Sequence, residues 1–248
     1  MNNTLNNGFR VLNFLAQSGR SHSVKELAEH FKLPNSHICR LLKTLLDTGY
    51  LEQDKSRKYL VSLNILSLAN ACLANLDLRN IAQVHLLKLQ RKLKNKVYLV
   101  KNLEGRALIV DAFGDSDEID FKTITIGQYN SPLHSASGKL CAAYASPEQQ
   151  KEILDTIEWG KACSGTAKNK SELLKNYSEI THKGYSEAVK ETSEDTYAVS
   201  VPVHDADGNL TGAVGSFCSI KNSSEEQRKN MLNSLLNTAD IISKSLSR

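Results

Sequence analysis

Three side chains that donate hydrogen bonds recur along the segment LPNSHICRLLKTLLD. Ser36, Arg40 and Lys43 are spaced three or four residues apart, which places them on one side of a helix. An Arg side chain donates two parallel hydrogen bonds to the edge of a guanine, and Lys neutralises phosphates. The same residue types also occur on a helix face that is only exposed to solvent and binds nothing. The pattern therefore needs support from the elements around it.

Residues typical of enzymes and metal sites do not form a recognisable pattern. The segment SASGK ends like a phosphate-binding loop but lacks its first glycine at the required spacing and a Ser or Thr after Lys139. There is no G-x-S-x-G, and the spacing assigns no nucleophile to His134 or His204. The five cysteines are far apart and form no C-x-x-C pair. We therefore expect no enzyme activity, no cofactor and no metal.

Positive charge is concentrated at the start of this chain of 248 residues, which holds 31 Lys or Arg and 27 Asp or Glu. The first 60 residues contain nine basic and five acidic residues, so the remainder is balanced. This asymmetry favours a polyanion-binding module joined to a neutral one. No run approaches the roughly 20 apolar residues that span a bilayer, and the start has no signal-peptide pattern. We expect a cytoplasmic protein without a membrane segment.

The first quarter of the chain predicts three helices. A first helix ends at Gly19, and its apolar positions recur at helical spacing: Phe9, Leu12, Leu15 and Ala16. Ser23 and Glu26 form a capping-box pattern that begins a second helix, which ends near Phe31. A third helix starts at Pro34 or Asn35. Two short helices joined by a tight turn are typical of a helix-turn-helix.

The third helix and the segment after it predict a nucleic-acid interface. Its apolar side holds Ile38, Leu41, Leu42 and Leu45, opposite the polar side described above. After Gly49, the runs YLEQ and KYLVS predict two strands around the turn DKSR. That hairpin carries three cations beside the helix: Lys55, Arg57 and Lys58. The pattern predicts a recognition helix followed by a basic wing.

The rest of the chain predicts alternating helices and strands. Helix-compatible sequence runs over 66–94 as a linker followed by a core helix, and a last helix covers 224–246. Strands are expected at 96–103, 106–113, 120–127, 197–204 and 210–219. Further helices are expected at 137–144, 147–157 and 171–183. The DADG segment before the last strand is expected to be a hairpin turn and not a calcium loop.

These segments, taken in order, resemble one known family. SVKELAEHFKLPNSHICRLLKTLLDTGYLEQD, PLHSASGKLCAAY, HKGYSEAVKETSEDTYAVSVPVHDADGNLTGAVGSF and a closing amphipathic helix are similar to the IclR-type transcriptional regulators. The resemblance implies an α+β protein with an N-terminal winged helix-turn-helix domain over 1–66, a linker helix over 67–80, and a C-terminal GAF-like α/β domain over 81–248. It also implies a homodimeric or homotetrameric repressor or activator of a catabolic operon that senses a small organic acid or sugar acid.

The resemblance also implies site residues. Those expected to contact double-stranded operator DNA are Ser23, Asn35, Ser36, His37, Arg40, Lys43, Lys55, Arg57 and Lys58. Those expected to surround a carboxylate effector are Ser135, Ala136, Ser137, Gly138, Glu191, Tyr197, Ala198, Gly215 and Phe217.

Within the effector set, the N–H groups of Ser137 and Gly138 are expected to hold the carboxylate, and bulk added at Gly138 is expected to block it. Ala198, Gly215 and Phe217 depart from the family pattern, as does Ala188 nearby; these losses of polar groups argue against the smallest keto acids.

An alternative function belongs to another class. In it the chain is a sensory or protein-interaction module, and the winged helix binds a protein and not specific DNA. Binding to DNA that weakens steeply with salt separates the two, because neutralised phosphates release counterions.

Overall fold

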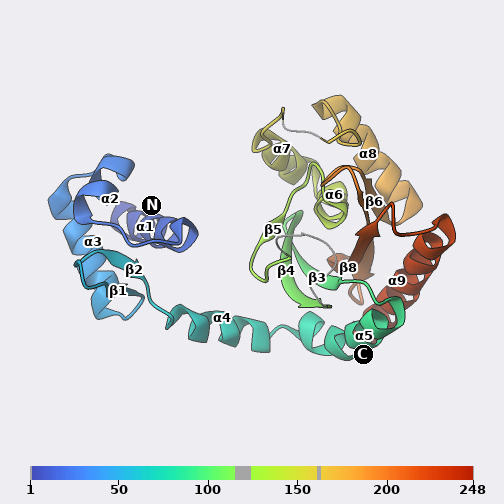
Figure 1. The fold of residues 1–248 in the computed structure, drawn as a ribbon, viewed down its shortest axis with the longest axis horizontal. Helices are drawn as coiled ribbons and strands as arrows, with labels where there is room; N and C mark the ends of the chain where they lie inside the picture. The colour runs from blue at the N-terminus through green and yellow to red at the C-terminus, as the bar shows by residue number, and fades with distance from the viewer. Residues whose placement is uncertain (1, 115–123, 161–162, 248) are drawn as a thin grey trace. The chain divides into compact units, whose positions relative to one another are not determined.

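The computed structural model describes residues 2–114, 124–160 and 163–247. Contacts within the chain divide it into two compact units, Met1–Asn75 and Leu76–Arg248. The first unit holds three helices, a two-stranded hairpin and a fourth helix, and the second holds a six-stranded sheet with helices (Figure 1). The α+β class with an N-terminal winged helix-turn-helix and a C-terminal α/β domain is confirmed.

The elements of the first unit are bounded as follows: α1 Asn3–Ser18, α2 Val24–Phe31, α3 Asn35–Asp47, β1 Leu51–Gln53, β2 Tyr59–Val61 and α4 Ile65–Ala74. Local signals set these bounds. Gly19 ends α1 in the left-handed region at φ 65°, and Ser23 with Glu26 forms the predicted capping box of α2. Antiparallel pairing of β1 with β2 builds the wing.

The core of the first unit lies between α1, α2 and α3. Leu27, Ile38 and Leu42 are fully buried there. The predicted apolar stripe of α1 is partly wrong, because Phe9 is 59% exposed while Val11 is fully buried. Helical spacing fits two overlapping stripes on α1, and packing in the shared core of this unit selects the one that contains Val11.

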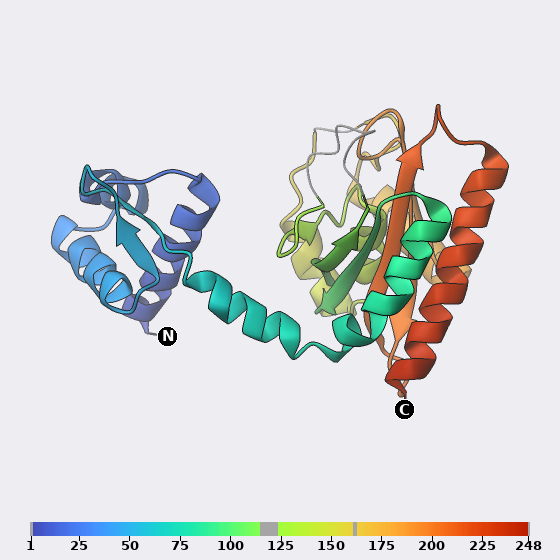
Figure 2. The ribbon, with the colours of Figure 1, turned by 60° about the horizontal axis from the view of Figure 1, so that its bottom comes forward.

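The elements of the second unit are α5 Asp77–Leu93, β3 Val97–Leu103, β4 Arg106–Phe113, β5 Tyr129–Asn130, α6 Ala136–Ala143, α7 Pro147–Asp155, α8 Lys170–Lys183, β6 Ser186–Val189, β7 Thr196–His204, β8 Leu210–Ser219 and α9 Glu225–Leu246. The strands form an antiparallel sheet in the order β5-β4-β3-β8-β7-β6. Helices α5 and α9 lie side by side over one face (Figure 2). On the other face α6 packs on the sheet and α8 packs on α6.

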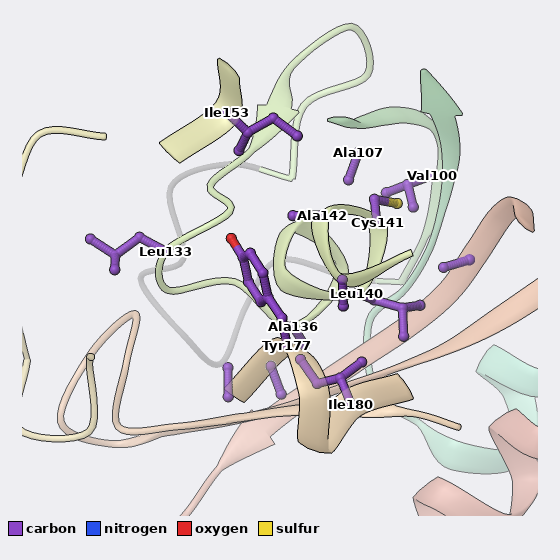
Figure 3. Packing of buried hydrophobic residues seen from close by; sticks show 14 of the residues in the cluster. Val100, Ala107, Leu133, Ala136, Leu140, Cys141, Ala142, Ile153, Tyr177 and Ile180 are labelled. Carbon is purple, nitrogen blue, oxygen red and sulfur yellow. The ribbon is translucent and has the colours of Figure 1, made fainter. Parts of the chain in front are cut away.

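The core on the α6 face combines small and aliphatic side chains with the rings of Tyr98, Tyr177 and Phe217. Leu140 and Cys141 of α6 lie between Val100 of the sheet and Tyr177 and Ile180 of α8 (Figure 3). Every residue of α6 is buried. The start of this helix is therefore held from all sides, and it is the element around which the predicted effector residues are arranged.

Two expectations need correction, and one strand was missed. The linker over 67–80 spans two helices instead of one, because Leu76 adopts an extended conformation between α4 and α5. The strand expected over 120–127 is absent from its described part, residues 124–127, and the short β5 follows it instead; residues 120–123 lie outside the described part. Strand β6 was not predicted.

None of the helices in the described part of the chain is long and apolar enough to cross a membrane.

Candidate DNA-binding and effector sites

The polar side of α3 and the wing tip are open to solvent. Six of the nine predicted DNA-binding residues are exposed: Asn35, Ser36, Arg40, Lys43, Lys55 and Arg57. No ion pair among the described residues involves the four cations of this set. Helix α3 carries no side-chain cap at its N-terminus. The N–H groups of Asn35 and Ser36 therefore remain available to a phosphate, whereas the His37 N–H donates to the Pro34 carbonyl at 2.9 Å.

The other three predicted DNA-binding residues have structural partners or are partly covered. The Ser23 hydroxyl accepts a hydrogen bond from the Glu26 N–H at 3.3 Å, and the Ser23 N–H donates to the Glu26 carboxylate at 2.7 Å. Hydrogen bonds to the Glu26 carboxylate from Ser23, first of all from its N–H, and from Arg20 lower the pKa of Glu26 to about 2. His37 is half-buried, with its Nε2 3.5 Å from the Asn7 side-chain amide of α1. Lys58 is half-buried in the wing.

The start of α6 is organised by its own serines. The Ser135 hydroxyl donates to the Ser131 carbonyl at 2.7 Å and accepts from the Gly138 N–H at 3.0 Å. The Gly138 N–H is therefore already satisfied, contrary to its predicted role in holding a carboxylate. The N–H groups of Ala136 and Ser137 belong to the first turn, which has no intrahelical acceptors.

A glycine is required at position 138 because the chain passes close by. A Cβ built on Gly138 would lie 2.0 Å from the Ser131 carbonyl oxygen. A bulky residue there would displace this backbone, so Gly138→Val tests the fold of the site and not only access of a ligand.

Three predicted effector residues lie on the sheet face that α6 covers. Ala198 and Phe217 are cross-strand partners and belong to the α6 core cluster. Gly215 pairs with Tyr98, whose ring lies over it: a Cβ on Gly215 would be 2.3 Å from Cζ of Tyr98. Tyr98 also hydrogen-bonds Ser137, and burial raises its pKa to about 12. Tyr98 was missed by sequence reasoning.

Tyr197 lies on the opposite face of the sheet from Ala198. Its hydroxyl donates to the Glu187 carboxylate at 2.6 Å, and the Arg228 guanidinium of α9 lies 5.7 Å from the centre of its ring. The structure therefore does not bring Tyr197 together with Ala198 and Phe217, because successive side chains of a strand point to opposite faces.

Glu191 is paired with a buried cation. The Lys139 Nζ donates to Glu191 Oε1 at 2.6 Å and to the Glu187 carbonyl at 2.7 Å. Burial raises the pKa of Glu191, and the positive charge of Lys139 opposes that shift. The other oxygen, Oε2, has no hydrogen-bond partner among the described residues. Lys139, which failed as part of a phosphate loop, thus has a structural partner that its sequence context did not indicate.

The chemistry of these two regions is that of binding. The first unit presents cations and amide donors on an exposed face. In the second unit, the buried start of α6 carries hydroxyl and N–H groups that can donate hydrogen bonds. No group of His, Cys, Asp and Glu side chains in the described part of the chain is arranged to hold a metal ion.

Comparison with known proteins gives the same picture. The bacterial transcriptional regulator IclR C-terminal model matches residues 70–244, and the IclR helix-turn-helix domain model matches residues 4–55. The HTH-type transcriptional regulator KdgR of Dickeya chrysanthemi is 28% identical over 234 residues, covering 93% of this chain and 75% of that protein. KdgR of Escherichia coli (strain K12) is 26% identical over 219 residues, covering 88% and 82%.

Solved structures share the fold. The Thermotoga maritima IclR crystal structure has a TM-score of 0.73 at 23% identity, with 99% of each chain covered. An IclR homolog from Microbacterium hydrocarbonoxydans, complexed with 4-hydroxybenzoate, has a TM-score of 0.80 at 18% identity, with 98% of each chain covered. The two family models together span nearly the whole sequence, and this chain belongs to the IclR family of DNA-binding transcriptional regulators.

Proposed function

We propose that this regulator binds the operator of a catabolic operon as a homodimer or homotetramer and acts there as a repressor or an activator. A small metabolite that carries a carboxylate controls this binding. The observation that carries the DNA part is the exposed row of donors on α3 beside a basic wing, with no ion pair to its cations within the described residues. Cations without intramolecular partners gain most from neutralising phosphates.

The effector part is supported by the start of α6. The N–H groups of Ala136 and Ser137 suit a carboxylate, and the relative from Microbacterium hydrocarbonoxydans is complexed with 4-hydroxybenzoate, a carboxylate. The residues proposed to surround the ligand are Ser135, Ala136, Ser137, Ala198, Gly215 and Phe217, with Glu191 nearby. Gly138, whose N–H is already bonded to Ser135, and Tyr197, which lies on the other face of the sheet, are outside this set. We further propose that the protein acts in the cytoplasm and is not an enzyme.

A two-stage experiment tests this function. DNA selected from a randomised pool is bound at increasing salt, and we expect the logarithm of the affinity to fall steeply with the logarithm of salt. A panel of keto acids, sugar acids and hydroxybenzoates is then screened for a raised melting temperature, because a ligand that binds only the folded state stabilises it. A hit should change DNA affinity roughly 5- to 150-fold. DNA binding without sequence preference would favour the protein-interaction alternative.

Arg40 is predicted to read a base. Arg40→Ala should weaken binding to the selected DNA by about 1 to 3 kcal/mol and relax preference at one base position, because it removes the two hydrogen bonds that the guanidinium donates to a base edge. Binding to a panel of single-position DNA variants measures this. Lys43→Ala is the matched control, expected to weaken all sequences alike. An equal weakening on every sequence for Arg40→Ala would show that Arg40 touches only phosphate.

Helix α4 is predicted to pack against a second copy. It has no side-chain N-cap and no buried residue, and Leu66 and Leu68 are 59% and 54% exposed. A ten-residue apolar helix is marginal alone in water, so it requires a partner surface. Leu66→Asp with Leu68→Asp should convert the dimer to monomer in sedimentation at micromolar concentration, and Ser67→Asp should not. A dimer that survives the Leu substitutions would place the interface elsewhere.

A further inference from the structure

The wing turn is closed by a single carboxylate. Oδ1 of Asp54 accepts hydrogen bonds from the Ser56 N–H at 2.8 Å and the Lys58 N–H at 3.0 Å. The main chain adds a bond from the Asp54 N–H to the Lys58 carbonyl at 2.9 Å and one from the Arg57 N–H to the Asp54 carbonyl at 3.0 Å. Four hydrogen bonds therefore connect Asp54 to the segment that carries the basic tip of the wing.

The same carboxylate also ties the wing to the loop between α1 and α2. Oδ2 of Asp54 accepts from the Ser21 hydroxyl at 2.6 Å. The next residue, His22, pairs with Tyr59 of β2 through two backbone hydrogen bonds of 2.8 and 2.9 Å. The hydrogen bonds from Ser21 and Lys58 lower the pKa of Asp54, so the carboxylate is charged at neutral pH. The loop before α2 thus pairs with β2 through an isolated antiparallel bridge and lies beside the wing hairpin.

The wing tip has a conformation that requires support. Arg57 has φ 58°, in the left-handed region that side chains other than glycine rarely adopt. Such a residue keeps this conformation only where its surroundings fix it. Here the bond from the Arg57 N–H to the Asp54 carbonyl does so. The side chains of Lys55 and Arg57 remain exposed.

We propose that Asp54 is a positioning residue for DNA binding, holding Lys55 and Arg57 of the wing where they neutralise phosphates. This inference rests on the proposed contact between the wing and DNA. It makes an unusual prediction, because Asp54 places a negative charge on a face that binds a polyanion. If only charge mattered, removing it would strengthen binding. If Asp54 positions the wing, removing it weakens binding and reduces the number of phosphates that the protein neutralises.

The experiment compares two acids of one hairpin in the full-length protein, using a duplex of about 30 base pairs selected by the wild type, which spans two half-sites and their flanks. Asp54→Ala should weaken binding about 5- to 30-fold and make the salt slope shallower by about 0.9 for each phosphate that is no longer neutralised. Glu52→Ala removes an exposed acid of β1 and should leave the slope unchanged, with equal or slightly tighter binding. Asp54→Asn keeps an acceptor for the two N–H groups and should restore most of the affinity.

The slope distinguishes positioning from a shortage of folded protein, because unfolding lowers the active fraction without changing the number of phosphates that each bound molecule neutralises. An Asp54→Ala variant that behaves like Glu52→Ala overturns the inference. If Asp54→Ala does not fold, Ser21→Ala decides: a shallower slope supports the role of Asp54, and the wild-type slope overturns it. The proposed function is tested separately by Lys55→Ala with Arg57→Ala, since an unchanged slope there means that the wing does not touch DNA.

Discussion

Replacing Lys139 by Met should destabilise the unit Leu76–Arg248 by about 3 to 5 kcal/mol, because it leaves a buried carboxylate without its partner charge. The side chains of Lys139 and Glu191 are only 4% and 8% exposed, and their ion pair measures 2.6 Å. Water cannot replace the missing cation at this burial without rearrangement of the loop after β6. Urea unfolding followed by the fluorescence of Trp159, the single tryptophan, measures the change in this unit.

The destabilisation should depend on pH in a defined direction. Burial already raises the pKa of Glu191, and removing Lys139 takes away the charge that opposes the shift. The folded variant then binds a proton at Glu191 that the unfolded chain, with an ordinary carboxyl pKa, releases. The destabilisation should therefore be largest at a pH above the raised pKa and shrink as the pH falls through it toward the ordinary value.

A second substitution provides the control. Glu191→Gln in the Lys139→Met background removes the unpaired charge, and it should recover most of the stability at neutral pH and abolish the pH dependence contributed by this site. Stability of Lys139→Met within about 1 kcal/mol of wild type at neutral pH would contradict the prediction, since it would mean that Glu191 finds solvent or another donor.

Local chemistry explains why the first unit was predictable. The capping box of Ser23 and Glu26, the left-handed Gly19 and the turn around Asp54 each depend on residues within a few positions of one another. Such signals are present in the sequence itself. The buried stripe of α1 could not be predicted in this way, because Val11 and Phe9 satisfy the helical period equally well. Only packing in the shared core of this unit distinguishes them.

Long-range pairing explains what was missed in the second unit. Strand β6 has four residues and lies at the edge of the sheet beside β7, where Glu187 pairs with Val199. Nothing in the letters SEAV indicates that partner. Tyr98 was missed for the same reason: a glycine within a strand indicates a close approach, but the residue that approaches Gly215 is set by the β3–β8 register.

One error could have been avoided from sequence alone. Tyr197 and Ala198 are adjacent on a predicted strand, and adjacent residues of a strand point to opposite faces. Both therefore cannot line one side of a sheet, yet the resemblance placed them together. The structure puts Tyr197 beside Arg228 of α9 and Ala198 in the α6 core.

Opposite results are expected from the same substitution at two glycines. Gly138→Ala should destabilise the second unit by about 3 kcal/mol, because its Cβ would lie 2.0 Å from the Ser131 carbonyl oxygen and 2.6 Å from Ser135 Oγ. The carbonyl cannot easily move, since it accepts from Ser135 Oγ, and the neighbouring Pro132 carbonyl is held by the Tyr177 hydroxyl at 2.8 Å. Overpacking against backbone therefore strains the whole start of α6.

Gly8→Ala is the matched control within α1. Its Cβ would meet only Leu41 Cδ2, at 4.0 Å, an ordinary contact, and alanine is favoured over glycine inside a helix by about 0.5 to 1 kcal/mol. Trp159 fluorescence in urea should show the destabilised second unit for Gly138→Ala, and amide exchange of α1 should slow for Gly8→Ala. If Gly138→Ala unfolds at the wild-type urea midpoint, the segment from Ser131 to Ser135 yields to a methyl group, and the start of α6 is not the rigid frame that a preformed carboxylate site requires.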